Sequence, residues 1–161
     1  MMRWAYLFVK EFSATGAEEA TFSGADTLPN NSYISDKIVA DLQSIADSSK
    51  LNCEKLLKLI GELNAAYSGG RVYSALAIVR AIIDHIPPIF GFIKFSEVHS
   101  NWAWGRTDKN YMLKLSDFRS TADDVLHRQI SSNVDLIEIE DLPPRTWLNR
   151  LLQECVQQLK P

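Results

Sequence analysis

The sequence predicts a mainly α-helical protein, a bundle of five or six helices around one central apolar helix at about residues 71–86. Three observations predict it. Apolar residues recur at helical spacing through most of the chain after residue 35. Glycine, proline and Ser/Asn-rich breaks separate these stretches. The 161 residues, of which 46% are hydrophobic, are enough to enclose one core without disulfide or metal staples.

The chain divides into a predicted N-terminal extension, residues 1–37, and a helical domain, residues 38–161. Aromatic residues alternate with other residues between positions 4 and 8, which is the period-two pattern of a short strand. Residues 13–35 are rich in Ser, Thr, Gly and Asn and predict a loop. The extension is therefore expected to consist of a strand followed by a loop.

Two amphipathic helices are predicted first. The apolar stripe of the first follows a cap at Ser35 or Asp36 and ends near Ala46. The second follows a cap at Asn52 and ends at the Gly69–Gly70 pair. Glycine is expected there because it adopts the left-handed conformation common at helix C-termini.

The segment at about residues 71–86 is apolar nearly all round, as expected of a helix buried on several faces. The Pro87–Pro88 pair must end it, since proline lacks an N–H donor and restricts the residue before it. The apolar connector that follows, residues 89–93, is expected to pack against the core. This helix is therefore the predicted centre of the fold.

Three more helices are predicted, at residues 95–104, 110–130 and 147–159, with a polar turn between the first two. Residues 134–139 mostly alternate between apolar and polar side chains, which indicates a strand. Pairing with residues 3–9 would make a short two-stranded β accessory. An isolated pair of strands is only marginally stable, so this pair would have to pack against the helices.

Composition excludes several classes of protein. The 17 Lys and Arg residues against 20 Asp and Glu give a net charge of −3, which argues against a strongly basic nucleic-acid binder. No apolar run approaches the ~20 residues of a membrane span, and the N-terminal run is too short for a signal peptide. We therefore expect a soluble cytoplasmic protein with no membrane partner.

No metal or cofactor is expected. The two cysteines, Cys53 and Cys155, lie 102 positions apart and outside any metal-binding spacing, and are expected to be reduced thiols. The three histidines, His85, His99 and His127, form neither HxH nor HExxH patterns.

The sharpest candidate for chemistry is the R-x4-H pair of Arg80 and His85. An arginine can hold a phosphate through its donor fork, and a histidine can move a proton near neutral pH, which suits metal-independent RNA cleavage. Asp84 would then be an orienting partner. In the structural alternative, Arg80 pairs with Asp84 four residues on, and His85 points about 140° away around the helix. Both interpretations stand as hypotheses.

A second candidate is a small-ligand pocket lined by Trp102, Trp104 and Tyr73. Indole and phenol rings supply large apolar surfaces with one polar group each, which suits a small ligand. The alternative is that these aromatic residues close the edge of the bundle, as such residues commonly do.

Two strings resemble an uncharacterised bacterial helical domain: ELNAAYSGG at residues 62–70 and AIVRAIIDHIPPIFG at residues 77–91. The resemblance covers about residues 38–160, and such domains occur alone or at the C-terminal end of longer proteins, often in mobile-element or defence settings. This chain is expected to be a mobile gene-cassette product. The R-x4-H is similar to that of HEPN domains, which include dimeric ribonucleases. The resemblance implies that Arg80 binds phosphate and that His85 transfers protons. One departure weakens this: Ala81 stands where many such ribonucleases have a polar residue.

Two functions are therefore expected. The first is a small, non-catalytic helical interaction or oligomerisation module, a homodimer that also contacts a protein partner. The alternative is a HEPN-like ribonuclease that cleaves RNA at a symmetric dimer cleft with Arg80 and His85. The directions in which these two side chains point distinguish the two functions.

Overall fold

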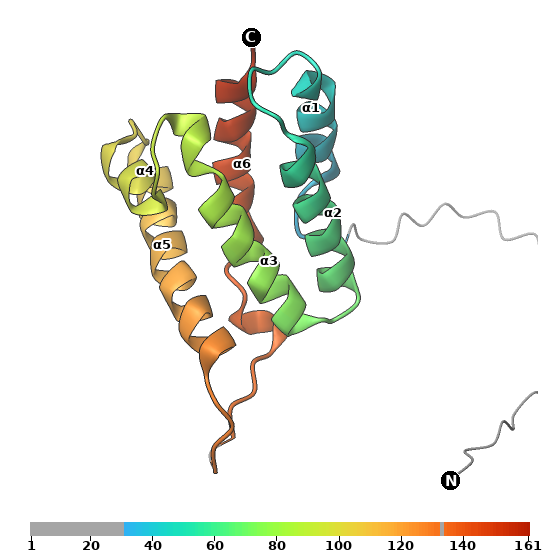
Figure 1. Ribbon diagram of the computed structural model, residues 1–161, viewed down its shortest axis with the longest axis vertical. Coiled ribbons are helices and arrows are strands. Elements are labelled where there is room, and N and C mark those ends of the chain that lie inside the picture. The colour runs from blue at the N-terminus through green and yellow to red at the C-terminus, as the bar shows by residue number, and fades with distance from the viewer. Residues whose placement is uncertain (1–30, 133) are drawn as a thin grey trace, which may run out of the picture.

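A computed structural model describes residues 31–132 and 134–161. In this part of the chain it contains α-helices and short 3-10 helices and no strand (Figure 1). The prediction of a mainly helical protein is confirmed. The predicted strand at residues 3–9 lies outside the described residues. The elements are α1 (Asp36–Ala46), α2 (Glu54–Ser68), α3 (Val72–His85), η1 (Pro87–Phe90), α4 (Phe95–Asn101), α5 (Arg106–His127), η2 (Ile139–Asp141) and α6 (Arg145–Leu159).

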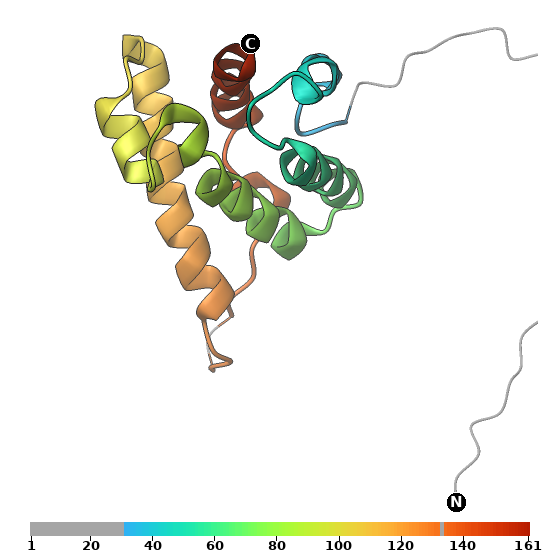
Figure 2. The same cartoon turned by 45° about the horizontal axis from the view of Figure 1, so that its top comes forward.

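The helices pack side by side, as the two views in Figures 1 and 2 show. Helix α3 contacts α2 and α5, while α6 contacts α1 and α5. The short helix α4 packs against α5, and η1 connects it to the end of α3. One continuous apolar core runs between these helices, and every described helix contributes to it except η2.

Helix α3 is the most apolar of the elements, and five of its residues are buried: Ala75, Leu76, Val79, Ile82 and Ile83. By length and composition, the segment Val72–Phe90 (19 residues, mean hydropathy 1.3) could cross a membrane, although no such segment was expected. Core helices of soluble proteins also meet these two criteria. The contacts of α3 with α2 and α5 are those of a core helix.

Glycine ends two segments where the backbone turns left-handed. Gly70 follows α2 with a φ of 64°, as the sequence predicts, and Gly91 follows η1 with a φ of 78°. The connector after the two prolines packs into the core only in part. Phe90 is buried, whereas Ile93 is 87% exposed, so the expectation fails at its end.

Two predicted segments differ from the structure. Residues 105–109 are not a polar turn, because α5 begins at Arg106 and Asp108 in its first turn pairs with Arg150 of α6. The predicted strand at 134–139 has no regular secondary structure at residues 134–138, and Ile139 begins the 3-10 helix η2. It forms no sheet because the described part of the chain offers it no second strand to pair with.

The loop predicted for residues 13–35 ends in an ordered part of the core. Tyr33 and Ile34 are buried, and their backbone groups are held by two asparagines. Asn64 of α2 bonds both the N–H and the C=O of Ile34, at 2.8 and 3.1 Å. Asn149 of α6 donates to the C=O of Tyr33 at 2.9 Å. This segment therefore ties α2 and α6 together just before α1 begins.

Candidate functional site

Arg80 belongs to a charge network between α3 and α5. Its Nη2 lies 2.6 Å from Oδ1 of Asp123 on α5, and its Nη1 lies 4.0 Å from Oδ2 of Asp84 on α3. Asp84 in turn accepts two hydrogen bonds from Arg119 of α5, at 2.9 and 3.3 Å. His127, one turn after Asp123, lies 3.6 Å from the same Oδ1. We call these five residues the α3–α5 charge network.

The network occupies the guanidinium of Arg80. A phosphate would have to displace Asp123 from Nη2 before it could bind there. The remaining nitrogen, Nε, is buried and has no hydrogen-bond partner among the described residues, so it is not available to a ligand from solvent. As placed, Arg80 joins α3 to α5.

His85 faces a different neighbour. It lines a small, mostly apolar pocket together with Leu51 and Leu56 from the α2 side and Leu159 of α6. Burial there, and secondarily the charge of Lys55, lowers the pKa of the imidazole. Because α3 packs between α2 and α5, the structure does not bring Arg80 and His85 together within one chain.

The histidine near Arg80 is instead His127. The sequence shows only that Asp123 and His127 are four residues apart on one helix. Nothing in that spacing indicates that Asp123 also meets Arg80, which is 43 residues away along the chain. The sequence shows the two acidic residues, Asp84 and Asp123, on predicted helices. Only the packing of α3 on α5 places Asp123 beside Arg80 and Asp84 beside Arg119.

The aromatic candidates divide between two ends of α3. Trp102 and Trp104 pack against Phe90, with ring centroids 5.0 and 5.7 Å from it, and Nε1 of Trp104 donates to the C=O of Val98. Tyr73 lies in the first turn of α3, and its hydroxyl donates to the C=O of Asp135 at 3.2 Å. The three residues therefore do not line one pocket.

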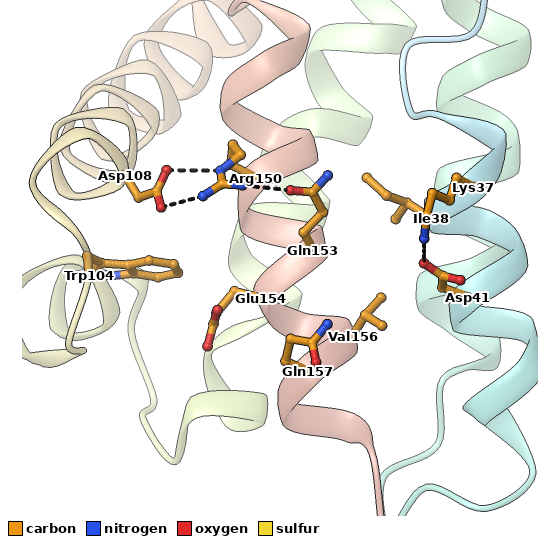
Figure 3. Close-up of a pocket in the computed structure, with 10 residues that line it drawn as sticks. All are labelled: Lys37, Ile38, Asp41, Trp104, Asp108, Arg150, Gln153, Glu154, Val156 and Gln157. Atoms are coloured by element: carbon orange, nitrogen blue, oxygen red, sulfur yellow. Dashed lines mark hydrogen bonds and ion pairs between the residues drawn. The ribbon is translucent and has the colours of Figure 1, made fainter.

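Trp104 borders a polar pocket of about 310 Å³ over α6 (Figure 3). Four of its five charged side chains form two ion pairs. Arg150 bonds both carboxylate oxygens of Asp108, at 3.0 and 2.7 Å, which lowers the pKa of Asp108. On the α1 side, Lys37 pairs with Asp41 at 2.7 Å. The Arg150–Asp108 pair ties α6 to α5, whereas the Lys37–Asp41 pair lies within α1. The fifth charged side chain, Glu154, accepts a hydrogen bond from Gln158 at 2.8 Å.

The described residues contain no group of three or more His, Cys, Asp or Glu side chains placed to hold a metal ion. Both cysteines are buried, and burial raises the pKa of Cys155 well above its usual range. Neither thiol is therefore an accessible thiolate in this structure.

If Arg80 is structural, it should be coupled energetically to Asp123. We expect Arg80→Met and Asp123→Asn each to lower the free energy of unfolding by about 1 kcal/mol, because the pair is only partly exposed. A double-mutant cycle by urea unfolding should give a coupling energy of about 0.5–1.5 kcal/mol. The pair Lys37 and Asp41, which is exposed, is the control and should couple more weakly. Coupling near zero for Arg80 and Asp123 would contradict the structural role.

The lowered pKa of His85 predicts a pH dependence of stability. The imidazole of His85 takes up a proton more readily in the unfolded state than in the folded state. Its contribution to the free energy of unfolding is therefore complete above its unfolded pKa of about 6.5 and is lost as the pH falls below that value. Between about pH 7.5 and about pH 5.5, the free energy of unfolding should fall less in His85→Gln than in the wild type. His99→Gln is the control for loss of an imidazole. Equal pH dependence of His85→Gln and the wild type would contradict the burial of His85.

Comparisons of the chain with models of known protein families, with curated proteins and with solved structures find no match in any of the three. The resemblance to bacterial helical domains of the HEPN type therefore stays a prediction from the motif residues. What the chain does is inferred from the positions and partners of its own side chains.

Proposed function

We propose that the protein is a small, non-catalytic helical interaction module that forms a homodimer through one apolar end. This end, the apolar tip, consists of Leu126 in the last turn of α5, Ile130, Val134 and Leu136 in the following loop, and Tyr73 of α3. The observation that carries the proposal is the exposure of the three loop residues. Ile130 is fully exposed, Val134 is 88% exposed and Leu136 is 72% exposed.

The tip contrasts with the rest of the described surface. Of the eight large apolar side chains that are exposed, five belong to the tip. In Figure 1 the chain leaves α5, forms this loop beyond the ends of the helices and returns toward α6. Exposed apolar side chains gathered in one part of the molecule are costly to leave in water and commonly mark a protein interface.

The loop is held in place from its polar side, which supports a defined contact surface. Arg128 forms ion pairs with both Asp124 and Asp135. The hydroxyl of Tyr73 donates a hydrogen bond to the C=O of Asp135. This bond holds the part of the loop that leads back toward α6 against the start of α3. A surface that is already ordered loses less conformational entropy on binding than a flexible one.

A second copy of the chain is the proposed occupant. Residues 134–138 form neither helix nor strand, and no backbone hydrogen bond joins residues 134–137 to another described segment. Two copies related by a two-fold axis can pair this segment antiparallel with itself. In such a pair Val134 and Leu136, which are two residues apart, lie on the same face, and each packs against a side chain of the other copy.

The same proposal takes α3 as the centre of the bundle and Arg80 as part of the scaffold. The ribonuclease alternative needs Arg80 and His85 at one site, whereas they face α5 and α2 respectively. No contact among the described residues favours the ribonuclease alternative, and we do not put it forward as a second function. RNA cleavage in EDTA that is lost in folded Arg80→Ala and His85→Ala variants would reinstate it.

Sedimentation equilibrium of the full chain tests the proposal. The wild type should be a dimer at micromolar concentration, and Val134→Lys/Leu136→Lys should be a monomer. A wild type that is monomeric at every concentration would contradict it.

A further inference from the structure

A basic pocket separate from the charge network and from the apolar tip lies between the end of α4 and the first two turns of α5. It has a volume of about 440 Å³ and is lined by His99, Ser100, Arg106, Lys109, Asn110 and Leu113. The four α5 residues follow the spacing i, i+3, i+4 and i+7, so they share one face of that helix. Its size is within the usual range for pockets that bind small molecules.

No carboxylate from residues 31–132 or 134–161 lines this pocket, although most basic residues nearby have an acidic or aromatic partner. On α5 itself, Arg119 pairs with Asp84, Arg128 pairs with Asp124 and Asp135, and Lys114 lies over the ring of Trp147. Within the described residues, Arg106 and Lys109 form no ion pair. The positive charge of the pocket is therefore not balanced by any residue that the structure describes.

The carboxylate nearest in sequence is turned away. Asp108 lies between the two cations, but on the opposite side of α5, where it bonds Arg150 of α6. Asp117, one turn beyond Leu113 on the same face, does not line the pocket. Two like charges three residues apart on a helix repel each other by about 0.2–0.5 kcal/mol. The arrangement thus lowers the stability of the free chain, and a bound anion would reverse that effect.

The pocket also holds hydrogen-bond donors that the fold does not use. In the described chain, the guanidinium of Arg106, the ammonium of Lys109 and the amide of Asn110 have no hydrogen-bond partner. His99 contacts Ser100 through Nδ1 at 3.3 Å, which leaves its Nε2 without a partner among these residues. Charged donors of this kind bind phosphate oxygens with short, strong hydrogen bonds. Leu113, which is exposed, adds an apolar side to the pocket.

We propose that this pocket binds a phosphate monoester carried on a small apolar body, independently of dimer formation. The phosphate lies between Arg106 and Lys109, and the apolar part of the ligand covers Leu113. The pocket is open to solvent on one side, so it admits a small molecule or the terminal phosphate group of a longer one.

Phenyl phosphate is the probe, titrated into the ¹⁵N-labelled full-length protein at low salt and followed by NMR. Backbone amides of residues 99–113 should shift, with a Kd of about 1 mM or tighter. Inorganic phosphate should bind several-fold more weakly and phenol not at all. Arg106→Gln/Lys109→Gln should weaken binding at least tenfold. Lys55→Gln/Lys58→Gln is the control, because it removes two charges at the same spacing from the exposed face of α2. It should leave the affinity for phenyl phosphate unchanged.

Each other outcome overturns a stated part of the proposal. Absence of shifts at residues 99–113 with phenyl phosphate overturns the site. Equal weakening by both double variants shows attraction to net charge alone, which also overturns the site. Inorganic phosphate that binds as tightly as phenyl phosphate overturns the apolar half of the ligand. A 5′-phosphorylated oligonucleotide that binds more tightly than its 5′-hydroxyl form identifies a nucleic-acid end as the source of the phosphate, whereas equal binding of the two forms excludes that source.

Discussion

Replacing Ile82 by alanine is expected to lower the free energy of unfolding by about 2–5 kcal/mol. Ile82 is fully buried in α3, the helix that contacts both α2 and α5. The substitution removes buried methyl and methylene groups and leaves a cavity that the neighbouring helices can fill only in part. A domain of this size is stabilised by only about 5–15 kcal/mol, so the loss is a large share of the total. Urea unfolding followed by circular dichroism measures it.

Ile93→Ala is the matched control, since it makes the same change at a side chain that is 87% exposed after η1. Its effect should stay within about 0.5 kcal/mol. Because alanine also has a higher helix propensity than isoleucine, propensity would slightly stabilise the Ile82 variant, so any loss there comes from packing. A loss below about 1 kcal/mol for Ile82→Ala would contradict the burial of Ile82 in the core.

The local sequence predicts the helices well because their periodic stripes and breaks are local properties. The helical stripe from Asp36, the Gly69–Gly70 stop and the end of α3 before Pro87 all appear where the residues indicate them. Each depends on backbone preferences within a few residues. What the local sequence does not indicate for these helices is how they pack against one another.

Other features depend on contacts between distant residues, and the sequence does not predict them. The start of α5 looks polar and irregular until Asp108 is paired with Arg150, 42 residues later. Tyr33 and Ile34 look like loop residues until Asn64 and Asn149 bond their backbone. The segment at 134–138 has strand periodicity, but pairing requires a partner that local sequence cannot supply.

The candidate site shows the same limit. The R-x4-H spacing places Arg80 and His85 on different sides of one helix, which the 3.6-residue period already indicates. What the spacing cannot show is which neighbour each one meets. Arg80 meets Asp123 of α5, and His85 meets the apolar residues around Leu56. Those neighbours decide between a scaffold and a catalytic pair.

The second large effect is expected at the apolar tip. Val134→Lys/Leu136→Lys should lower the dimer association constant at least 100-fold, or about 3 kcal/mol, because burying each aliphatic side chain contributes about 1.5–3 kcal/mol. The two-fold axis applies each substitution twice. Lysine at these exposed positions also brings like charges together across the interface. The monomer should keep its fold, since neither side chain contributes to the core.

Two controls accompany this variant. Leu51→Lys/Ile93→Lys places the same charges at exposed apolar residues outside the tip and should leave the dimer intact. Replacing Trp4, Tyr6 and Phe8 by serine in the full chain tests whether that apolar stretch covers the tip instead. If it did, the triple variant would change self-association as much as the tip variant does. We expect no change.

The most direct test of the proposed function is therefore sedimentation equilibrium of the wild type and the Val134→Lys/Leu136→Lys variant at matched concentrations. The account predicts a wild-type dimer at micromolar concentration, and a folded monomer for the variant with unchanged circular dichroism. A wild type that is monomeric throughout, or a variant that dimerises as tightly as the wild type, would contradict it.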